Sequence, residues 1–251
     1  MTELVSTERL GRTLVVSMRR EEKRNAVDRN LADALDAAFN MLDDDPDIWA
    51  GVLTGSKTVF SAGSDLASRG DYVTDRGGEY GLIRRQRTKP LIASVEGLAL
   101  GGGFELVLAC DLVVAARDAR FGLPEVTRGV IPTCGALFRG PQALPLNLAR
   151  EMILTGQPVE ASRLYAAGVV NVLTEPGEAR GAAVTLAQRI CTNAPLAVQA
   201  CLHALGQIVR SEEATGWSAT KQAQDTNNRT QDVLEGVHAF FEKRAPQWAG
   251  R

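Results

Sequence analysis

The sequence is poor in the residues that build nucleophilic and metal sites. Its two histidines, His203 and His238, both fall in helical segments near the end of the chain, and no GxSxG motif is present. A Ser-His-Asp hydrolase is therefore a poor fit. The cysteines form no CxxC pair and no metal-ligand spacing, so we predict reduced packing residues, with no disulfide and no metal site. These cysteines are Cys110, Cys134, Cys191 and Cys201.

The chain also lacks an excess of charge and a long apolar run. Lys and Arg number 28 against 30 Asp and Glu, so the net charge of −2 favours neither nucleic acid nor an anionic membrane as a partner. The first residues, MTELVSTERL, do not have the basic-then-apolar order of a secretion signal, and no later stretch is long enough to span a bilayer. We expect a cytoplasmic protein that holds any anionic ligand through local cations.

Short apolar runs alternate with helical patterns through the first half of the 251 residues. Segment 28–42 places Leu31, Leu35 and Leu42 on one helical face, with Asp28 as the N-cap. A hydrophobic content of 45% supports a substantial core. The alternation predicts an α/β fold with much parallel strand pairing. The expected strands are 13–18, 50–55, 91–95 and 112–116, and the expected helices are 28–42 and 102–111.

The second half of the chain is predicted to be mainly helical. Residues 139–156 have a helical pattern, 169–173 is a last strand, and 178–243 is almost wholly helical, with Pro195 as a break between two helices. This tail has no identifiable catalytic motif. Segment 72–89 is the most polar and glycine-containing part of the chain, so we predict a mobile surface segment there.

Three consecutive glycines, Gly101 to Gly103, interrupt an apolar run and precede a helical pattern. Such a triplet marks a close approach of the backbone, and free N–H groups at a helix start favour negative charge. A dinucleotide-binding fingerprint fits less well, because Leu106 occupies its third glycine position. The Gly102 N–H is therefore a candidate donor to an oxyanion, and the small-residue loop 60–66 is a candidate for a second donor.

Two glutamates near these loops are candidates for acid and base. Glu105 stands in the apolar run GGGFELVLAC, where an ionised carboxylate is expensive without partners. Glu125 follows Pro124 on a turn after a strand, where spacing alone favours a surface helix cap. Paired with Glu105 in a different environment, however, Glu125 gives a site two carboxylates that divide acid and base roles.

Four ordered motifs resemble those of the crotonase family, the enoyl-CoA hydratases and isomerases. They are REEKRNAVD, VFSAGSDL, VEGLALGGGFELVLACD and ARFGLPEVTRGVIP, and the similarity extends to a helical tail ending FFEKRAPQWAGR. The resemblance implies a crotonase fold, a spiral of ββα units, with a CoA-thioester site in residues 1–194. It also implies a helical oligomerisation region in 195–251, a homotrimer or hexamer, and a reaction without metal or redox cofactor.

The resemblance assigns roles to individual residues. The N–H groups of Ser64 and Gly102 form the oxyanion hole, and Glu105 and Glu125 are the acid/base pair that holds one water. The implied contacts with the CoA thioester are Lys23, Arg24, Ala26, Ala62, Ser64, Asp65, Leu66, Leu100, Gly101, Gly102, Pro124 and Thr133.

Local cations are needed to hold the polyanionic CoA. For Lys23 and Arg24, ligand contact and plain surface are equally good interpretations. The run formed by Arg84, Arg85, Arg87 and Lys89 is a second possible source, although a solvated helix face is the better interpretation of it.

The sequence also departs from the family pattern. Glu21 replaces a common proline and Ser64 a frequent alanine, while the segment with Thr133, Cys134 and Phe138 replaces one richer in small residues, so the acyl specificity is open.

The preferred activity is the reversible hydration of a 2-enoyl-CoA, because both glutamates are present. An enoyl-CoA isomerase, or a dehydratase of a substituted acyl-CoA such as a carnitinyl thioester, stays possible because fold does not fix reaction. A non-catalytic acyl-CoA-binding or protein-binding homologue is a third possibility, which the intact glutamates disfavour.

Overall fold

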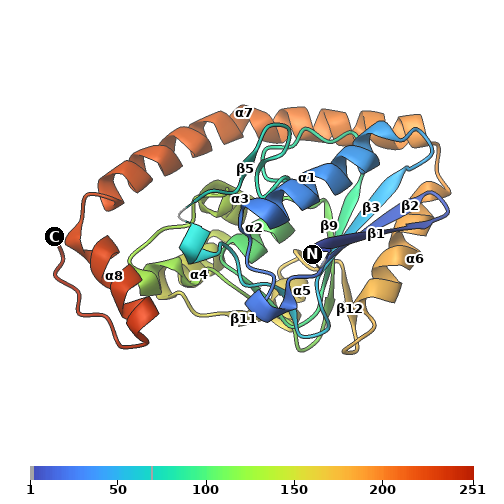
Figure 1. Ribbon diagram of the computed structural model, residues 1–251. Helices are drawn as coiled ribbons and strands as arrows, with labels where there is room; N and C mark the ends of the chain where they lie inside the picture. Colours follow the sequence, from blue (N-terminus) through green and yellow to red (C-terminus); the bar gives the residue numbers. More distant parts are fainter. Residues whose placement is uncertain (1–2, 69) are drawn as a thin grey trace.

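A computed structural model describes residues 3–68 and 70–251 and contains two main sheets (Figure 1). In the six-stranded sheet the order is β1-β2-β3-β7-β9-β12, and all neighbours except the β1–β2 hairpin are parallel. This confirms the predicted α/β class with parallel pairing. The strands of this sheet are β1 (Val5–Leu10), β2 (Thr13–Met18), β3 (Ala50–Thr54), β7 (Leu91–Val95), β9 (Leu112–Ala116) and β12 (Val172–Thr174).

A second, four-stranded sheet has the order β11-β10-β8-β4, and a small two-stranded sheet pairs β5 (Val73–Thr74) with β6 (Gly78–Glu79). Strands of two or three residues are too short to display a period of two, so the sequence pattern did not reveal them. The strands of the second sheet are β4 (Val59–Ser61), β8 (Leu98–Leu100), β10 (Arg120–Gly122) and β11 (Val159–Glu160).

The two sheets are linked by repeated units. In the pairs β3 and β4, β7 and β8, and β9 and β10, the first strand joins the large sheet and the second joins the small sheet. The chain thereby advances by one strand in both sheets at each step. The loops that follow β4 and β8, which carry the predicted oxyanion donors, therefore leave neighbouring strands of the four-stranded sheet.

The helices pack on both faces of the large sheet. Helix α6 covers the face formed by Val15, Val52 and Ile92, while the opposite face, with Leu14 and Leu53, joins the main core. Burial of both faces explains why these strands are apolar throughout. The helices are α1 (Arg29–Asp44), α2 (Gly102–Leu108), α3 (Ala136–Ala143), α4 (Leu146–Thr155), α5 (Ala161–Ala166), α6 (Ala179–Cys191), α7 (Pro195–Asn227) and α8 (Gln231–Glu242).

Local signals at two helix boundaries are confirmed, and one expected helix is divided. Asp28 caps α1, because its Oδ1 accepts a hydrogen bond of 2.9 Å from Leu31 N. Pro195 stands in the first turn of α7, and three residues separate it from the end of α6. The expected helix at 139–156 is instead two helices, because the chain is extended at Leu144 and Pro145 between α3 and α4. Among the described helices, none combines the length and apolarity that crossing a membrane requires.

The C-terminal helices extend along and beyond the core. Figure 1 shows α7 running along one side of the molecule, with α8 at its far end, away from the large sheet. Helix α7 also carries Cys201, which is exposed, while Cys134 is buried and Cys110 and Cys191 are half-buried. All four cysteines are free, but the predicted packing role is wrong for Cys201, because it lies on an uncovered face of α7.

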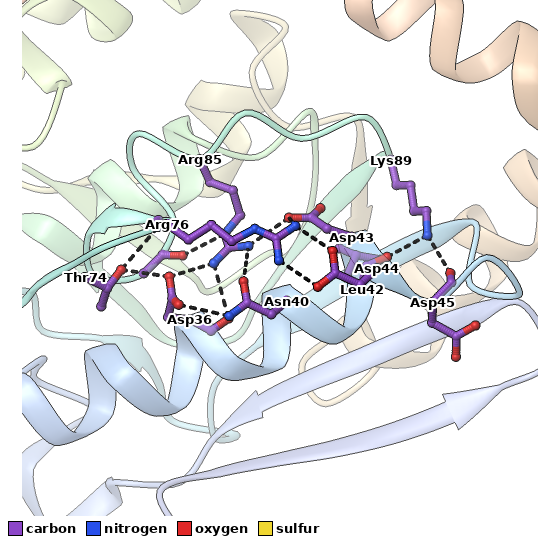
Figure 2. A network of polar contacts seen from close by, with 12 residues as sticks. Asp36, Asn40, Leu42, Asp43, Asp44, Asp45, Thr74, Arg76, Arg85 and Lys89 are labelled. Atoms are coloured by element: carbon purple, nitrogen blue, oxygen red, sulfur yellow. Dashed lines mark hydrogen bonds and ion pairs between the residues drawn. The ribbon is translucent and has the colours of Figure 1, made fainter.

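Segment 72–89 is largely packed against α1, so its prediction as a surface segment is wrong (Figure 2). The side chain of Arg85 is only 1% exposed and forms ion pairs with Asp36 at 2.6 Å and Asp43 at 2.8 Å. Lys89 Nζ donates to the carbonyls of Leu42 and Asp45. The end of a helix leaves carbonyls without partners, and cations are favoured there.

The basic run therefore forms no solvated helix face. Arg87 pairs with Asp111 at 2.7 Å, and Arg84 pairs with Glu79 and lies over the ring of Trp217. The side chains of the basic run therefore pair with other residues of the same chain. Their partners lie up to 133 residues away in the chain, which local patterning does not reveal.

Candidate active site

Each glycine of the triplet at the start of α2 has its own structural reason. Gly101 has a φ of 55°, a conformation that other residues rarely adopt. A Cβ on Gly102 would lie 2.3 Å from the Tyr80 hydroxyl oxygen, and one on Gly103 would lie 2.2 Å from the carbonyl oxygen of Ser61. The triplet therefore allows α2 to start in direct contact with two other segments.

The loop after β4, which contains Gly63 and Ser64, lies against the start of α2. Val27 N donates to Gly63 O, and Asp65 N donates to Val27 O, so the amide of the intervening Ser64 faces away from Val27. A Cβ on Gly63 would lie only 2.8 Å from Gly102 N, which shows how closely the two loops approach. Within residues 3–68 and 70–251, neither Ser64 N–H nor Gly102 N–H has a hydrogen-bond acceptor. Two unpaired amides on touching loops suit an oxyanion.

Glu105 lies in the first turn of α2 and is 2% exposed. Its Oε1 accepts hydrogen bonds from Cys134 N at 2.8 Å and Ala136 N at 3.0 Å, at the start of α3. Burial raises the pKa of Glu105 to about 7, although these two N–H donors act in the opposite direction. The carboxyl group is thus fixed in place and able to exchange a proton near neutral pH.

Glu125 lies in the 3₁₀ helix η3 (Pro124–Arg128), and the surface helix cap is contradicted. Its Oε2 is buried and has no hydrogen-bond partner among the described residues, and its Oε1 would be 3.2 Å from a Cβ on Gly101. Burial raises the pKa of Glu125 to about 8, and the charge of Glu105 contributes to the rise. The structure thus brings both predicted acids to the triplet, and their mutual repulsion favours a pair that shares a proton.

Hydroxyl groups border the same place. Ser64 Oγ and the Tyr80 hydroxyl oxygen are 2.6 Å apart, and the rings of Tyr72 and Tyr80 lie 4.7 Å apart at an angle of 47°. Burial raises the pKa of Tyr72 to about 12, opposed by hydrogen bonds with Ser64 and Thr133. Neither tyrosine was expected at the site from the sequence. The only signal was the glycine-flanked sequence GGEYG, which indicates tight packing around Tyr80.

The motif REEKRNAVD contains two cationic side chains and also holds the loop after β4 in place. Lys23 and Arg24 are exposed, and neither side chain has an ion pair within the described parts of the chain. Arg20, which the sequence analysis did not identify, pairs with Asp28 and Asp65 at 2.8 and 2.9 Å. The carboxylate of Asp65 is therefore already paired with an arginine of the same chain.

Two further residues of this motif support the same loop. Asn25 is fully buried and donates to the carbonyls of Val59 and Phe60. The half-buried Ala26 accepts a hydrogen bond from Arg20 through its carbonyl oxygen. The motif thus fixes the backbone next to Ser64.

The other predicted contact residues occupy the ends of elements around the two loops. Ala62 follows β4 and donates to Arg24 O at 3.0 Å, and Leu66 begins the 3₁₀ helix η2 (Leu66–Ser68). Leu100 ends β8 immediately before the triplet, and Pro124 begins η3. All four are half-buried, so each has surface available to a ligand.

Comparisons with known proteins agree with this geometry. A family profile described as enoyl-CoA hydratase/isomerase matches residues 10–251. The chain is 37% identical over 266 aligned residues to a carnitinyl-CoA dehydratase of Salmonella typhi, covering 100% of both chains. It is 36% identical over 256 residues to the enoyl-CoA hydratase EchA19 of Mycobacterium tuberculosis, covering 97% of this chain and 96% of that protein.

A solved structure extends the likeness to three dimensions. The crystal structure of a carnitinyl-CoA hydratase from Mycobacterium avium has a TM-score of 0.94 and 38% sequence identity, with 100% of both chains covered. The predicted spiral of strand pairs with a helical C-terminal region, the crotonase fold, is thereby confirmed. Sequence and structure together show that this chain belongs to the enoyl-CoA hydratase/isomerase family, the crotonase family.

Proposed function

We propose that this protein is an enoyl-CoA hydratase, a hydro-lyase that reversibly adds water to a 2-enoyl-CoA thioester. The observation that carries the proposal is the pair formed by the buried Glu105 and the half-buried Glu125, whose Oε2 is buried, next to the two amides without an acceptor among the described residues. Relatives named enoyl-CoA hydratase and carnitinyl-CoA dehydratase, similar over nearly the whole chain, support the same reaction class.

In the proposed mechanism the thioester oxygen accepts hydrogen bonds from Ser64 N and Gly102 N. One glutamate takes a proton from a water molecule, whose oxygen bonds to the β-carbon, and the other glutamate gives a proton to the α-carbon. The electrons of the double bond pass through an enolate, whose oxygen the amides stabilise. The proposed reaction consumes one water, oxidises nothing and requires no metal or redox cofactor.

The exposed cations of the first motif suit the CoA phosphates. Lys23 and Arg24 are exposed without an ion pair among the described residues, so their binding to a polyanion breaks no internal contact. We propose that they bind CoA phosphate groups, and that the acyl thioester lies along Ala26, Ala62, Asp65, Leu66, Leu100, Gly101, Pro124 and Thr133. The alternative, that Lys23 and Arg24 are plain surface, predicts unchanged CoA affinity when both are replaced by alanine.

A dehydratase of a substituted acyl-CoA is the second candidate. It uses the same acid and base in the reverse direction, and relatives with carnitinyl-CoA in their names support it. The mass of the product distinguishes a hydratase and a dehydratase from an enoyl-CoA isomerase, because isomerisation neither adds nor removes water.

The proposed activity is tested with crotonyl-CoA and longer enoyl-CoAs, by following the loss of absorbance of the conjugated thioester. The matched control is the double variant Glu105→Gln, Glu125→Gln, which keeps the shape of both side chains. We expect hydration by the wild type and a rate near background for the control. Equal rates would contradict the proposal, and tight CoA-thioester binding with no turnover of any substrate would favour a non-catalytic binding protein.

We also propose that residues 195–251 form contacts between copies of the chain, as in a trimer or hexamer. Helix α8 and the residues after it expose large apolar side chains: Leu234 is 63% exposed, Phe241 55% and Trp248 47%. Light scattering on the purified protein measures the number of copies, and a monomer at micromolar concentration would contradict this. The cytoplasmic location stays a prediction.

A further inference from the structure

The Tyr80 hydroxyl contacts both loops that carry the proposed oxyanion donors. It lies 2.6 Å from Ser64 Oγ, and its oxygen would be 2.3 Å from a Cβ on Gly102. Tyr80 itself is 1% exposed, whereas Ser64 is half-buried and accessible to a ligand. A phenolic O–H thus lies directly behind the two residues whose amides are proposed to bind the thioester oxygen.

The position of Tyr80 is enforced by the surrounding structure. Its φ of 57° is unusual for a bulky residue and costs free energy. The adjacent Gly81 packs so tightly on α1 that a Cβ there would lie 2.6 Å from Asp36 N. The ion pairs of Arg85 with Asp36 and Asp43, drawn in Figure 2, anchor the same segment to α1. Strain that buried ion pairs maintain next to a reaction site indicates a functional reason for the residue.

The hydroxyl groups of Tyr80 and Ser64 share one hydrogen bond. Burial raises the pKa of Tyr80 well above its ordinary value, so its hydroxyl keeps its proton across the working pH range. The Tyr80 hydroxyl oxygen and Ser64 Oγ are 2.6 Å apart, and either hydroxyl can be the donor of this hydrogen bond. When Tyr80 donates to Ser64, the Ser64 O–H is left to donate elsewhere.

We propose that the Ser64 hydroxyl is a third donor to the enolate oxygen, beside the amides of Ser64 and Gly102, and that Tyr80 is the positioning residue that orients it. The N–H and O–H of one serine are close enough to share an acceptor. As the thioester oxygen becomes negative, it becomes a stronger acceptor than a neutral hydroxyl, and the Ser64 O–H turns to it. The added hydrogen bond forms as charge develops, so it stabilises the transition state more than the bound substrate.

The inference rests on the proposed enolate chemistry, and its test uses a probe that needs no hydration. Acetoacetyl-CoA has an acidic methylene group, and its enolate absorbs in the near ultraviolet. The apparent pKa of the bound probe is measured in the wild type, Ser64→Ala, Tyr80→Phe and the double variant. Tyr165→Phe is the matched control, because Tyr165 lies on α5 and is 51% exposed. Calorimetry with saturated butyryl-CoA reports binding without an enolate.

We expect Ser64→Ala to reduce the enolate population by about 10- to 100-fold at a fixed pH, the loss of one hydrogen bond to a charged group. Tyr80→Phe should reduce it by a smaller factor, about 3- to 10-fold, because the donor remains but is no longer oriented. The double variant should equal Ser64→Ala, since Tyr80 acts through Ser64. Butyryl-CoA affinity and the Tyr165→Phe control should stay near wild type.

Two results would overturn the inference. One is an enolate population in Ser64→Ala equal to that of the wild type, which is readable even if Tyr80→Phe fails to fold. The other is an equal loss of butyryl-CoA affinity and enolate, which would indicate general packing. If the wild type itself fails to stabilise the enolate, the proposed function fails as well, whereas a stabilised enolate that is indifferent to Ser64 removes only the third donor.

Discussion

Two buried glutamates nine positions apart serve different purposes in this protein. Glu96, between β7 and β8, accepts hydrogen bonds from Gly177 N and Ala179 N, and Glu105 accepts them from Cys134 N and Ala136 N. Each therefore anchors the start of a later helix. Glu96 uses both oxygens, because Oε2 also accepts from Gly177 N, whereas Glu105 uses only Oε1 for these contacts.

This difference distinguishes Glu96, which only holds the start of α6, from Glu105, which is also proposed to transfer a proton. A carboxylate that is held through both oxygens is fixed by those donors, while one that is held through a single oxygen leaves the other oxygen clear of them for chemistry. The second carboxylate of the site, Glu125, lies next to Glu105 and interacts with it electrostatically. Burial of a glutamate is thus insufficient to identify an acid or base, and the count of donors on each oxygen is more informative.

The largest expected effect is on the rate of hydration. Glu105→Gln or Glu125→Gln should lower kcat by about 10²- to 10⁴-fold, the usual contribution of general acid–base catalysis. Glu96→Gln is the matched control and should keep kcat near wild type, because the amide oxygen still accepts from α6. Steady-state kinetics with crotonyl-CoA checks both. A decrease in kcat for Glu96→Gln as large as that for Glu105→Gln would contradict a purely structural role of Glu96.

The pH dependence of kcat should differ from that of an ordinary carboxylate pair. The site requires one proton on the pair, and the pKa values are raised to about 7 and about 8. Activity should therefore fall below about pH 7 as both groups become protonated, and above about pH 8 as both become ionised, by up to about tenfold per pH unit. A pH–rate profile in crotonyl-CoA hydration measures this. An acidic limb near pH 4 to 5 would contradict the environments described above.

The anchoring role of Glu96 should appear as stability. Glu96→Ala removes the acceptor of the Gly177 and Ala179 N–H groups at the start of α6, and the buried Ala179 N–H accounts for a loss of about 1–3 kcal/mol, because Gly177 is exposed to water. Since 1 kcal/mol corresponds to about 2–4 °C for a chain of this size, we expect Tm to fall by several degrees. Thermal unfolding followed by circular dichroism measures it. An unchanged Tm with reduced kcat would assign Glu96 to the chemistry instead.

The smallest expected effect is a gain in stability when Glu125 loses its charge. Its pKa is raised from about 4.3 in the unfolded chain to about 8 in the folded protein. The folded state binds the proton more tightly, so wild-type stability falls as the pH rises through this window and is lowest above pH 8. Glu125→Gln should therefore raise Tm by a few degrees at pH 9 and change it little at pH 5. A gain that is equal at both pH values would contradict the raised pKa.

Local sequence signals predicted the elements that depend on neighbouring residues. The β-branched run of β2, the capped α1 and the buried strands β3, β7 and β9 were all expected from patterns of fewer than 20 residues. Glu105 was visible as a carboxylate in an apolar run, and the triplet as a place of close approach. These inferences succeed because periodicity, capping and burial leave traces in short stretches of chain.

Other features were decided by contacts between distant segments. Arg20 meets Asp65 across 45 positions, and Arg85 meets Asp36 across 49, so neither ion pair has a trace in local sequence. The same applies to Tyr80, whose hydroxyl reaches Ser64 only because its segment is packed on α1. Segment 72–89 therefore looked like a polar surface segment.

The sequence by itself determined that this chain alternates strands and helices, carries a flexible glycine triplet before a buried acid, and belongs with the enoyl-CoA hydratases and isomerases. Only the tertiary structure decided that the Glu125 carboxyl group, with one oxygen buried, interacts with Glu105, that Glu96 anchors α6, and that the basic run pairs with residues of the same chain. The physical reason is that pKa values, burial and hydrogen-bond partners are set by atoms within a few ångströms, and those atoms come from residues far apart in the chain.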